Sequence, residues 1–342
     1  MTIPVPYLLF LGDAPHAKTA QGVRDWRPEL CLGQLRFPGS KLDLRLPEMT
    51  LEEAVAAGVK SVLLGAAPAG GVLPEAWLDS LERALDLGMD IASGLHTKLN
   101  DVPALKTRAD SLGRKLHDVR HPTGSFPIGD FAPRPGRRLL TVGADCAVGK
   151  MYTALAIERE MHGRGWNVDF RATGQTGIFI AGSGISVDAV ISDFVSAAAA
   201  TLSPANADDH WDIIEGQGSL FHPAYAGVTL GLVHGSQPDA MVLCADPTRR
   251  TIGEFDFYPQ PDLSACITAY ESAARLTNSR ATVVAISLNT STLPAEDALA
   301  LLKRTADLYG LPCVDPFRTG VAPVVDALAR SFAPANATQA PQ

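Results

Sequence analysis

The chain has 342 residues, enough for two domains that each bury a core. It is 46% hydrophobic and 19% charged with a formal net charge of −8, which is typical of a globular α/β protein and argues against nucleic acid as a partner. Five cysteines without CxxC spacing indicate reduced thiols and a cytoplasmic location. No apolar run is long enough to span a membrane, and the first residues lack the basic region of a signal peptide.

Short apolar strands alternate with helices in the first third of the chain. We expect strands at 7–11, 61–64 and 90–92, and helices at 51–57, 74–87 and 103–116. Strands and helices that alternate at this spacing are typical of a parallel sheet. The pattern therefore predicts a Rossmann-like domain over residues 1–121. Residues 122–138 follow with four prolines, three glycines and three arginines, and we interpret them as a linker.

Three polar residues of this first domain are candidates for a binding site. Lys18 and His96 follow predicted strands, as does the pair Gly70-Gly71, and Arg120 precedes the linker. Carboxyl ends of parallel strands meet at one edge of a sheet, where open α/β sheets bind ligands. A plainer interpretation stays open for two of them: Lys18 as a solvated lysine and His96 as a hydrogen-bonded imidazole.

The second part of the chain begins with the pattern of a phosphate-binding loop. A strand is expected at 139–142, a small-residue loop ends in Gly149-Lys150, and a helix follows over 152–158. Small residues let backbone N–H groups face an anion, while the helix N-terminus and the lysine add positive charge. The alternative is an ordinary turn between strand and helix. The residues predicted to bind the ligand are Asp145, Cys146, Ala147, Val148, Gly149, Lys150, Met151 and Tyr152.

The loop lacks the hydroxyl that usually binds magnesium. Met151 stands where a Ser or Thr is expected, and a thioether is a poor ligand for a hard cation. Thr153 lies about 200° further round the helix and cannot replace it. The sequence therefore predicts an anion cradle that needs no metal.

The remaining elements predict a P-loop NTPase-like, three-layer α/β domain over 139–332 with a mostly parallel sheet, followed by a disordered tail at 333–342. Strands are expected at 167–171, 211–214, 240–245, 281–287 and 311–314, and helices at 188–200, 263–276, 294–308 and 320–329. Residues 172–177 are interpreted as a loop. Glu215 follows an apolar strand, where P-loop proteins place an acid. Arg171 and Arg249 stand at other predicted strand ends.

Six short motifs together resemble a known family. They are Ala17-Lys18-Thr19-Ala20, Ser93-Gly94-Leu95-His96, Asp145-Cys146-Ala147-Val148-Gly149-Lys150, Thr173-Gly174-Gln175-Thr176-Gly177, Glu215-Gly216-Gln217-Gly218-Ser219 and Asp246-Pro247-Thr248-Arg249. In this order, over residues 7–329, the set is similar to the D-glutamate N-acetyltransferases, a family once described as of unknown function with a dethiobiotin-synthetase-like P-loop. The resemblance implies the same two domains, and transfer of acetyl from acetyl-CoA to the amino group of D-glutamate in D-glutamate catabolism.

The resemblance also suggests roles for the candidates. Glu215 would accept the proton of the amine, and Gln175, Gln217 or backbone N–H groups would stabilise the oxyanion. The P-loop would hold the phosphates of acetyl-CoA without a metal. Cations would bind the two carboxylates of the substrate, and we expect these substrate residues among Lys18, His96, Arg120, Arg171 and Arg249.

Several alternatives stay open. Glu215 could only hydrogen-bond the P-loop or order a water, and Arg249 and Arg250 could form a surface or subunit ion pair. Cys146 could fill the loop or carry an acetyl group. An Mg-ATP-dependent kinase or ligase acting on a small carboxylate or amino acid is the alternative enzyme, and a nucleotide sensor without catalysis is the third hypothesis. We expect small-molecule substrates, no membrane partner and a homo-oligomer, most simply a dimer.

Overall fold

The computed structural model describes residues 3–66, 68, 71–122, 124–253 and 255–332. The predicted tail at 333–342 and Gly70 lie outside the described residues. The chain forms two compact units. Unit 1 consists of residues 1–124 and 174–189, and unit 2 consists of residues 125–173 and 190–342.

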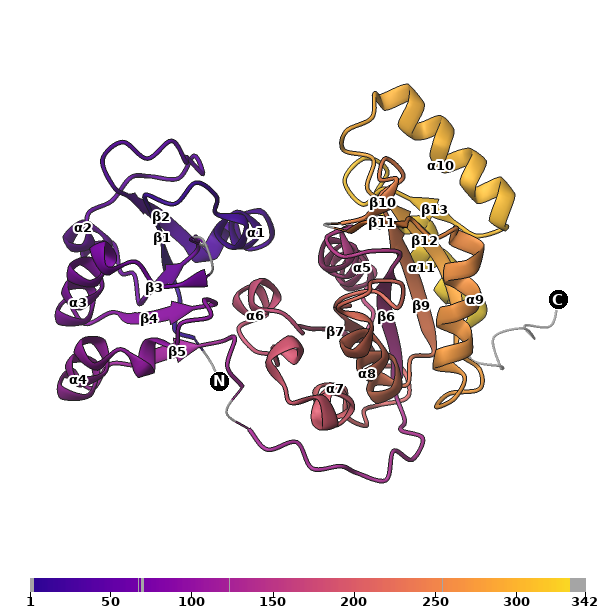
Figure 1. The fold of residues 1–342 in the computed structure, drawn as a ribbon, viewed down its shortest axis with the longest axis horizontal. Helices are drawn as coiled ribbons and strands as arrows, with labels where there is room; N and C mark the ends of the chain where they lie inside the picture. The colour runs from indigo at the N-terminus through magenta and orange to yellow at the C-terminus, as the bar shows by residue number, and fades with distance from the viewer. Residues whose placement is uncertain (1–2, 67, 69–70, 123, 254, 333–342) are drawn as a thin grey trace. The chain divides into compact units, whose positions relative to one another are not determined.

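Unit 1 is built on a five-stranded parallel sheet (Figure 1). The strand order is β2-β1-β3-β4-β5, with β1 (Tyr7–Gly12), β2 (Cys31–Arg36), β3 (Ser61–Leu64), β4 (Asp90–Ser93) and β5 (Leu116–Asp118). The helices are α1 (Lys18–Trp26), α2 (Leu51–Ala56), α3 (Leu78–Asp86) and α4 (Pro103–Leu112). Strands β1, β3 and β4 are buried along their whole length, as is usual for a parallel sheet. The parallel α/β class predicted for this part is confirmed.

One helix of unit 1 comes from the middle of the chain. Residues 172–177 were predicted to be a loop of the P-loop domain, but α6 (Gln175–Ala181) begins there and belongs to unit 1. The hydroxyl oxygens of Thr19 in α1 and Thr176 in α6 lie 3.1 Å apart. Within α6 the side chains of Ile178, Phe179 and Ile180 are buried, so an apolar part of this helix packs on the rest of the unit.

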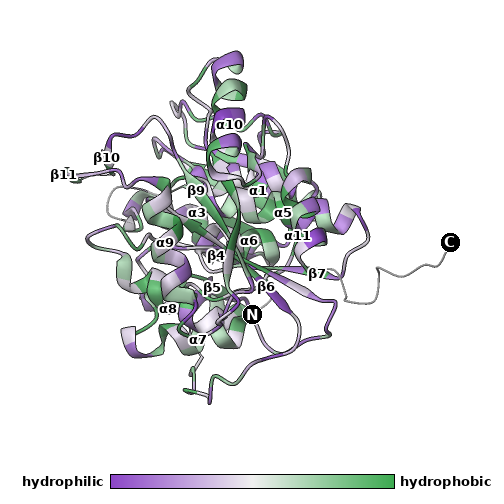
Figure 2. Cartoon of the chain, turned by 90° about the vertical axis from the view of Figure 1, so that its right-hand side faces the viewer, coloured by the Kyte–Doolittle hydropathy of each residue, from purple (hydrophilic) through white to green (hydrophobic). Residues whose placement is uncertain are grey.

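Unit 2 contains a six-stranded parallel sheet in the order β13-β12-β9-β6-β8-β7. Its strands are β6 (Arg137–Gly143), β7 (Val168–Arg171), β8 (Trp211–Ile214), β9 (Ala240–Ala245), β12 (Thr282–Leu288) and β13 (Cys313–Val314). Figure 2 shows β9 in green because its residues are hydrophobic. A two-stranded antiparallel hairpin, β10 (Thr251–Ile252) and β11 (Phe255–Pro259), follows β9.

Helices cover both faces of this sheet, as predicted for three layers. The helices are α5 (Lys150–Gly163), α7 (Val195–Leu202), α8 (Ala226–Ser236), α9 (Leu263–Ala274), α10 (Ala295–Tyr309) and α11 (Ala322–Ser331). One core joins the sheet to α5 and α11, where Met161 and Leu328 are fully buried. The other joins it to α8, α9 and α10 through residues such as Tyr270. Each buried side chain of this size stabilises the fold by about 1.5–3 kcal/mol.

No helix among the described residues has both the length and the apolar character that a membrane span needs.

Candidate functional site

The predicted P-loop lies between β6 and α5 in unit 2. Its backbone curls through the left-handed region at Ala147 (φ 52°) and Gly149 (φ 97°), and Gly149 caps the N-terminus of α5. The side chain of Lys150 is buried, and its Nζ donates to the carbonyl oxygen of Asp145 at 2.8 Å. Burial lowers the pKa of Lys150, although neighbours that include Cys146 and Asp145 oppose the shift. Lysine and helix N-terminus thus meet in one loop, the arrangement that binds phosphate.

The carboxylate of Asp145 holds the loop together. It is fully buried, and its Oδ1 accepts from the N–H of Cys146 at 2.6 Å. Its Oδ2 accepts from Arg249 Nη1 at 2.7 Å, from Gly253 N at 2.9 Å and from Gln260 Nε2 at 2.9 Å. Burial alone would raise the pKa of Asp145. The hydrogen bonds that its carboxylate accepts, chiefly from Gly253 and Arg249, outweigh the effect of burial and lower the pKa. The hairpin β10–β11 is therefore tied to the P-loop.

Glu215 stands at the carboxyl end of β8, as predicted. Its side chain is buried, and Oε2 accepts from the N–H of Thr173 at 2.9 Å. Thr173 Oγ1 donates to the carbonyl of Glu215 at 2.7 Å and accepts from Gln217 Nε2 at 3.2 Å. The next residue, Gly216, packs so closely on β6 that a Cβ there would lie 1.7 Å from the carbonyl oxygen of Thr141. The acid is thus held beside the P-loop strand, and the structure joins Glu215 to Gln217 through Thr173.

His222 is a further buried residue at this edge. Its ring stacks on Tyr225 with centroids 4.5 Å apart and meets the edge of Phe255 at 5.2 Å. Nδ1 accepts from the N–H of Ala224 at 3.2 Å, so the neutral imidazole carries its proton on Nε2. Polar atoms of Asp145, Cys146 and His222 all lie within 4.8 Å of one another. Since four N–H donors already bond the Asp145 carboxylate, this cluster favours hydrogen bonding over metal ligation.

The first turn of α5 presents the other predicted ligand-binding residues. Met151 and Tyr152 are partly exposed, and the ring centroid of Tyr152 lies 5.3 Å from that of Phe317. Thr153 is buried, with its hydroxyl 2.8 Å from Ser287 Oγ. Thr153 therefore faces the sheet and does not replace the hydroxyl missing at Met151. Cys146 is partly exposed and Val148 is buried.

Three of the predicted substrate cations have carboxylate partners. Arg249 bonds Asp145 and the carbonyl oxygens of Cys146 and Ala147 at 2.8 and 3.1 Å. It thus forms an ion pair with a buried acid of the P-loop, and not the surface pair that the sequence left open. Arg171 Nε donates to Asp212 at 2.7 Å, and Arg120 Nη2 donates to Asp188 at 2.7 Å.

The two remaining substrate candidates lie in unit 1. Lys18 begins α1 and is exposed, and among the described residues it has no ion-pair partner. His96 is exposed on the loop after β4, and its carbonyl oxygen lies 3.1 Å from His121 Nε2. Gln175 begins α6, where its side chain packs against Gly94 of the same loop. Unit 1 thus places Lys18 and His96 after strands of its own sheet and Gln175 against the loop after β4, whereas Glu215 and Gln217 belong to unit 2.

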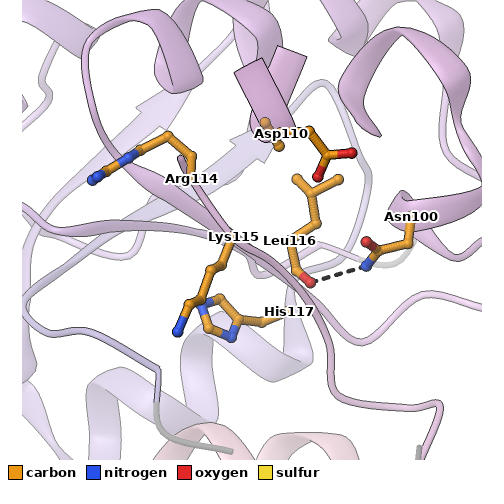
Figure 3. A pocket seen from close by; sticks show the side chains of 7 residues that line it. Asn100, Asp110, Arg114, Lys115, Leu116 and His117 are labelled. Carbon is orange, nitrogen blue, oxygen red and sulfur yellow. Dashed lines mark hydrogen bonds between the residues drawn. The ribbon is translucent and has the colours of Figure 1, made fainter. Parts of the chain in front are cut away.

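Two cavities contain none of the predicted site residues. Figure 3 shows the first, of about 320 Å³, between α4 and β5, where Asn100 Nδ2 donates to the carbonyl of Leu116 at 3.0 Å. The second, of about 870 Å³, lies where β6 begins. Its Arg134 and Arg138 donate to backbone carbonyl oxygens, so these guanidinium groups support the fold.

Two residues of the site have no role in the sequence-based prediction. His222 follows the Glu215 loop by a few residues, and extending the strand-end argument along that loop would have found it. Gln260 follows a hairpin that the sequence pattern does not predict, and no local signal marks it. Only the tertiary contact with Asp145 reveals it.

Two family models match the chain. One is described as a P-loop domain of unknown function, DUF1611_C, and covers residues 128–325. The other is described as a Rossmann-like domain of unknown function, DUF1611_N, and covers residues 38–122. The chain belongs to the DUF1611 family. These matches confirm the pair of domain types predicted from the sequence.

Similar proteins in this family extend over nearly the whole chain. A D-glutamate N-acetyltransferase of Tritonibacter scottomollicae is 52% identical over 330 residues, 96% of this chain and 99% of the relative. Another of that name, from a Pseudoalteromonas species, is 47% identical over 328 residues, 95% of this chain and 99% of the relative. The crystal structure of a DUF1611 family protein from Anabaena variabilis superposes with a TM-score of 0.83 at 32% identity, covering 95% of this chain and 99% of that one. The family resemblance inferred from the six motifs is confirmed.

Proposed function

We propose that this DUF1611 protein is an N-acetyltransferase that moves acetyl from acetyl-CoA to the amino group of D-glutamate, in D-glutamate catabolism. The names of the two relatives, which align over almost their full length, support the reaction and the handedness of the substrate. The P-loop is the observation that supports acetyl-CoA as the donor. It combines a buried lysine and a helix N-terminus with Met151 at the position that usually binds magnesium. Coenzyme A offers a pyrophosphate to such a loop, and acetyl transfer moves no phosphoryl group.

The P-loop residues would hold the donor. Backbone N–H groups from Ala147 to Lys150 and the Nζ of Lys150 would bind the pyrophosphate, because the N–H of Cys146 already bonds Asp145. Met151 offers no hard oxygen at the position that usually ligates magnesium. We therefore propose that the reaction needs no metal.

Glu215 would accept a proton from the substrate ammonium group, directly or through a water. A neutral amine is needed for attack on the thioester carbonyl, and proton removal by a positioned base contributes about 10²–10⁴-fold to such reactions. Thr173 and Gln217 would position Glu215, since both belong to its hydrogen-bond network. The Nε2–H of His222 is a donor of the kind that stabilises a thioester oxyanion.

The two carboxylates of D-glutamate need cationic partners. Lys18 is exposed at a strand end and has no ion-pair partner among the described residues, which favours it over Arg120, Arg171 and Arg249. His96 stays in the proposed substrate set with Lys18, and Gln175 stays a candidate for stabilising the oxyanion. The guanidinium of Arg249 supports this proposal only indirectly, because it holds the P-loop.

One assay tests the proposal. Purified protein incubated with acetyl-CoA and D-glutamate in the presence of a chelator should release free coenzyme A and form N-acetyl-D-glutamate. L-Glutamate and D-aspartate are assayed in parallel as control substrates that differ from D-glutamate in handedness and in length. Absence of thiol release with acidic amino acids of either hand would contradict the proposal, and Mg²⁺-dependent formation of ADP from ATP would favour the kinase or ligase.

Setting and assembly complete the proposal. The partners are small molecules, without nucleic acid or membrane, and the protein acts in the cytoplasm as a homo-oligomer. The net charge of −8 argues against nucleic acid as a partner, and the dispersed cysteines support a cytoplasmic location. Sedimentation of the purified protein measures its oligomeric state.

A further inference from the structure

Phe317 is a large apolar side chain held in solvent. It is 71% exposed, although its backbone is fixed by the buried carboxylate of Asp315. Oδ1 of Asp315 accepts from the N–H of Phe317 at 3.0 Å and from that of Arg318 at 3.2 Å. Oδ2 accepts from the N–H of Thr290 at 3.1 Å, in the loop after β12. Phe317 is thus presented by a rigid turn after β13 and not by a free loop tip.

The exposed ring lies beside the helix that begins at the P-loop. Tyr152 is two residues beyond Lys150, and its ring centroid is 5.3 Å from that of Phe317 with the planes at 52°. Tyr152 is partly exposed as well. Because α5 starts at the phosphate cradle and β13 ends at the same edge of the sheet, the aromatic pair stands within one helical turn of the lysine that would bind phosphate.

We propose that Tyr152 and Phe317 form a platform on which the adenine ring of the donor stacks. In acetyl-CoA a single ribose joins the adenine to the pyrophosphate, so a pyrophosphate in the P-loop brings the purine to the edge where these rings lie. Every base offers a π-face, and stacking on an aromatic side chain is a common way to bind one. The inference rests on the proposed function, because it takes coenzyme A as the ligand.

Calorimetry with fragments of the donor tests the platform. Coenzyme A, ADP and 4′-phosphopantetheine are titrated into the full chain and its Phe317→Ala variant. 4′-Phosphopantetheine lacks the adenosine 3′-phosphate and one phosphate of the pyrophosphate. Loss of one stacked face should weaken coenzyme A and ADP by about 5- to 150-fold. The affinity for 4′-phosphopantetheine should change less than about twofold.

Three further variants separate stacking from other effects. Phe317→Trp keeps a π-face and should retain the affinity for coenzyme A, whereas Phe317→Leu is apolar without one and should behave like Phe317→Ala. Leu276→Ala removes a side chain that is 76% exposed just after α9, and should leave all three affinities unchanged. If Phe317→Ala fails to fold, the affinities of Phe317→Leu and Phe317→Trp for coenzyme A test the platform instead.

The outcomes distinguish this inference from the proposed function. Equal loss for coenzyme A and 4′-phosphopantetheine, or no loss for coenzyme A, would overturn the platform while the acetyltransferase stands. Binding of ADP that depends on Phe317, without binding of coenzyme A, would support a purine platform and contradict acetyl-CoA as the donor.

Discussion

Arg249 and Asp145 form an ion pair at 2.7 Å that joins two loops of unit 2. The same guanidinium donates to the carbonyl oxygens of Cys146 and Ala147. Asp145 is fully buried, whereas the Arg249 side chain is 28% exposed. The pair therefore shapes the P-loop from behind, and of the loop N–H groups the Asp145 carboxylate takes up that of Cys146.

Arg249→Ala should lower the free energy of unfolding by about 1.5–3 kcal/mol, the range for a hydrogen bond to a charged group. The reason is that Asp145 stays buried and loses its cation. Urea unfolding measures the change. Arg250→Ala is the matched control, because Arg250 is exposed and should stay within about 0.5 kcal/mol of the wild type.

The stability lost in Arg249→Ala should depend on pH. The pKa of Asp145 is lowered in the folded state, so its carboxylate contributes stability that is present at neutral pH and is lost as the pH falls below about 4. Removing Arg249 raises the folded-state pKa toward its unfolded value. The difference in unfolding free energy between wild type and variant should therefore shrink as the pH is lowered. A difference that is constant with pH would show that Arg249 acts through packing alone.

Gly216→Ala and Gly227→Ala should change stability in opposite directions. A Cβ at Gly216 would lie 1.7 Å from the carbonyl oxygen of Thr141, so we expect a loss of more than about 4 kcal/mol or failure to fold. Gly227 lies in α8 with nothing within 4 Å of the added carbon, and alanine there should gain about 0.5–1 kcal/mol. Thermal unfolding of the two variants measures both. A tolerated Gly216→Ala would contradict the close approach of this segment to β6.

The elements that the sequence predicted well are those with strong local signals. The P-loop strand, the small-residue loop and α5 were expected because their pattern is local, and Glu215 because a strand end marks it. Helix α8 was not predicted, since Gly227, Gly231 and Gly235 are poor helix formers. The structure explains two of these glycines: a Cβ at Gly231 or Gly235 would collide with Val195 or Ser196 of α7.

The site was less predictable than the fold because ion pairs depend on distant residues. Arg171 stands at the end of β7, yet it bonds Asp212 of the neighbouring strand. Asp212 lies in β8 three residues before Glu215, a spacing that places two side chains of an extended segment on opposite faces. The contact between Arg171 and Asp212 depends on the sheet order, which places β7 beside β8. The position of α6 in unit 1 likewise depends on its packing and not on its sequence.

Glu215→Gln should lower kcat by about 10²–10⁴-fold, the usual contribution of a general base. The amide oxygen of glutamine still accepts the N–H of Thr173, so stability should fall by only about 1 kcal/mol. Steady-state kinetics and urea unfolding measure the two effects. Glu271→Gln is the matched control, because Glu271 Oε1 likewise accepts a backbone N–H, from Val283 at 3.0 Å, and its change should leave kcat unaltered. Full activity of Glu215→Gln would reduce Glu215 to a residue that orders the loop.

Lys150→Met should raise the stability of the protein while it weakens donor binding. Burial lowers the pKa of Lys150, which means that the folded state disfavours its charge, and methionine supplies a similar volume without one. We expect a net gain at neutral pH, reduced by the loss of the hydrogen bond to the carbonyl oxygen of Asp145, which is worth about 0.5–1.5 kcal/mol. Affinity for coenzyme A should fall by about 1.5–3 kcal/mol, the worth of a charged hydrogen bond to phosphate.

The pH dependence supplies the control for this variant. Because the folded-state pKa of Lys150 lies below the unfolded value of about 10.4, the unfolded state binds more protons and the wild type gains stability as the pH rises toward that value. Lys150→Met has no lysine to titrate there. The difference in free energy of unfolding between this variant and the wild type should therefore shrink between about pH 8 and 10. Urea unfolding at both values, with calorimetry of coenzyme A, measures the two effects. A variant that loses stability and still binds coenzyme A would show that the lysine supports the fold and does not contact the donor.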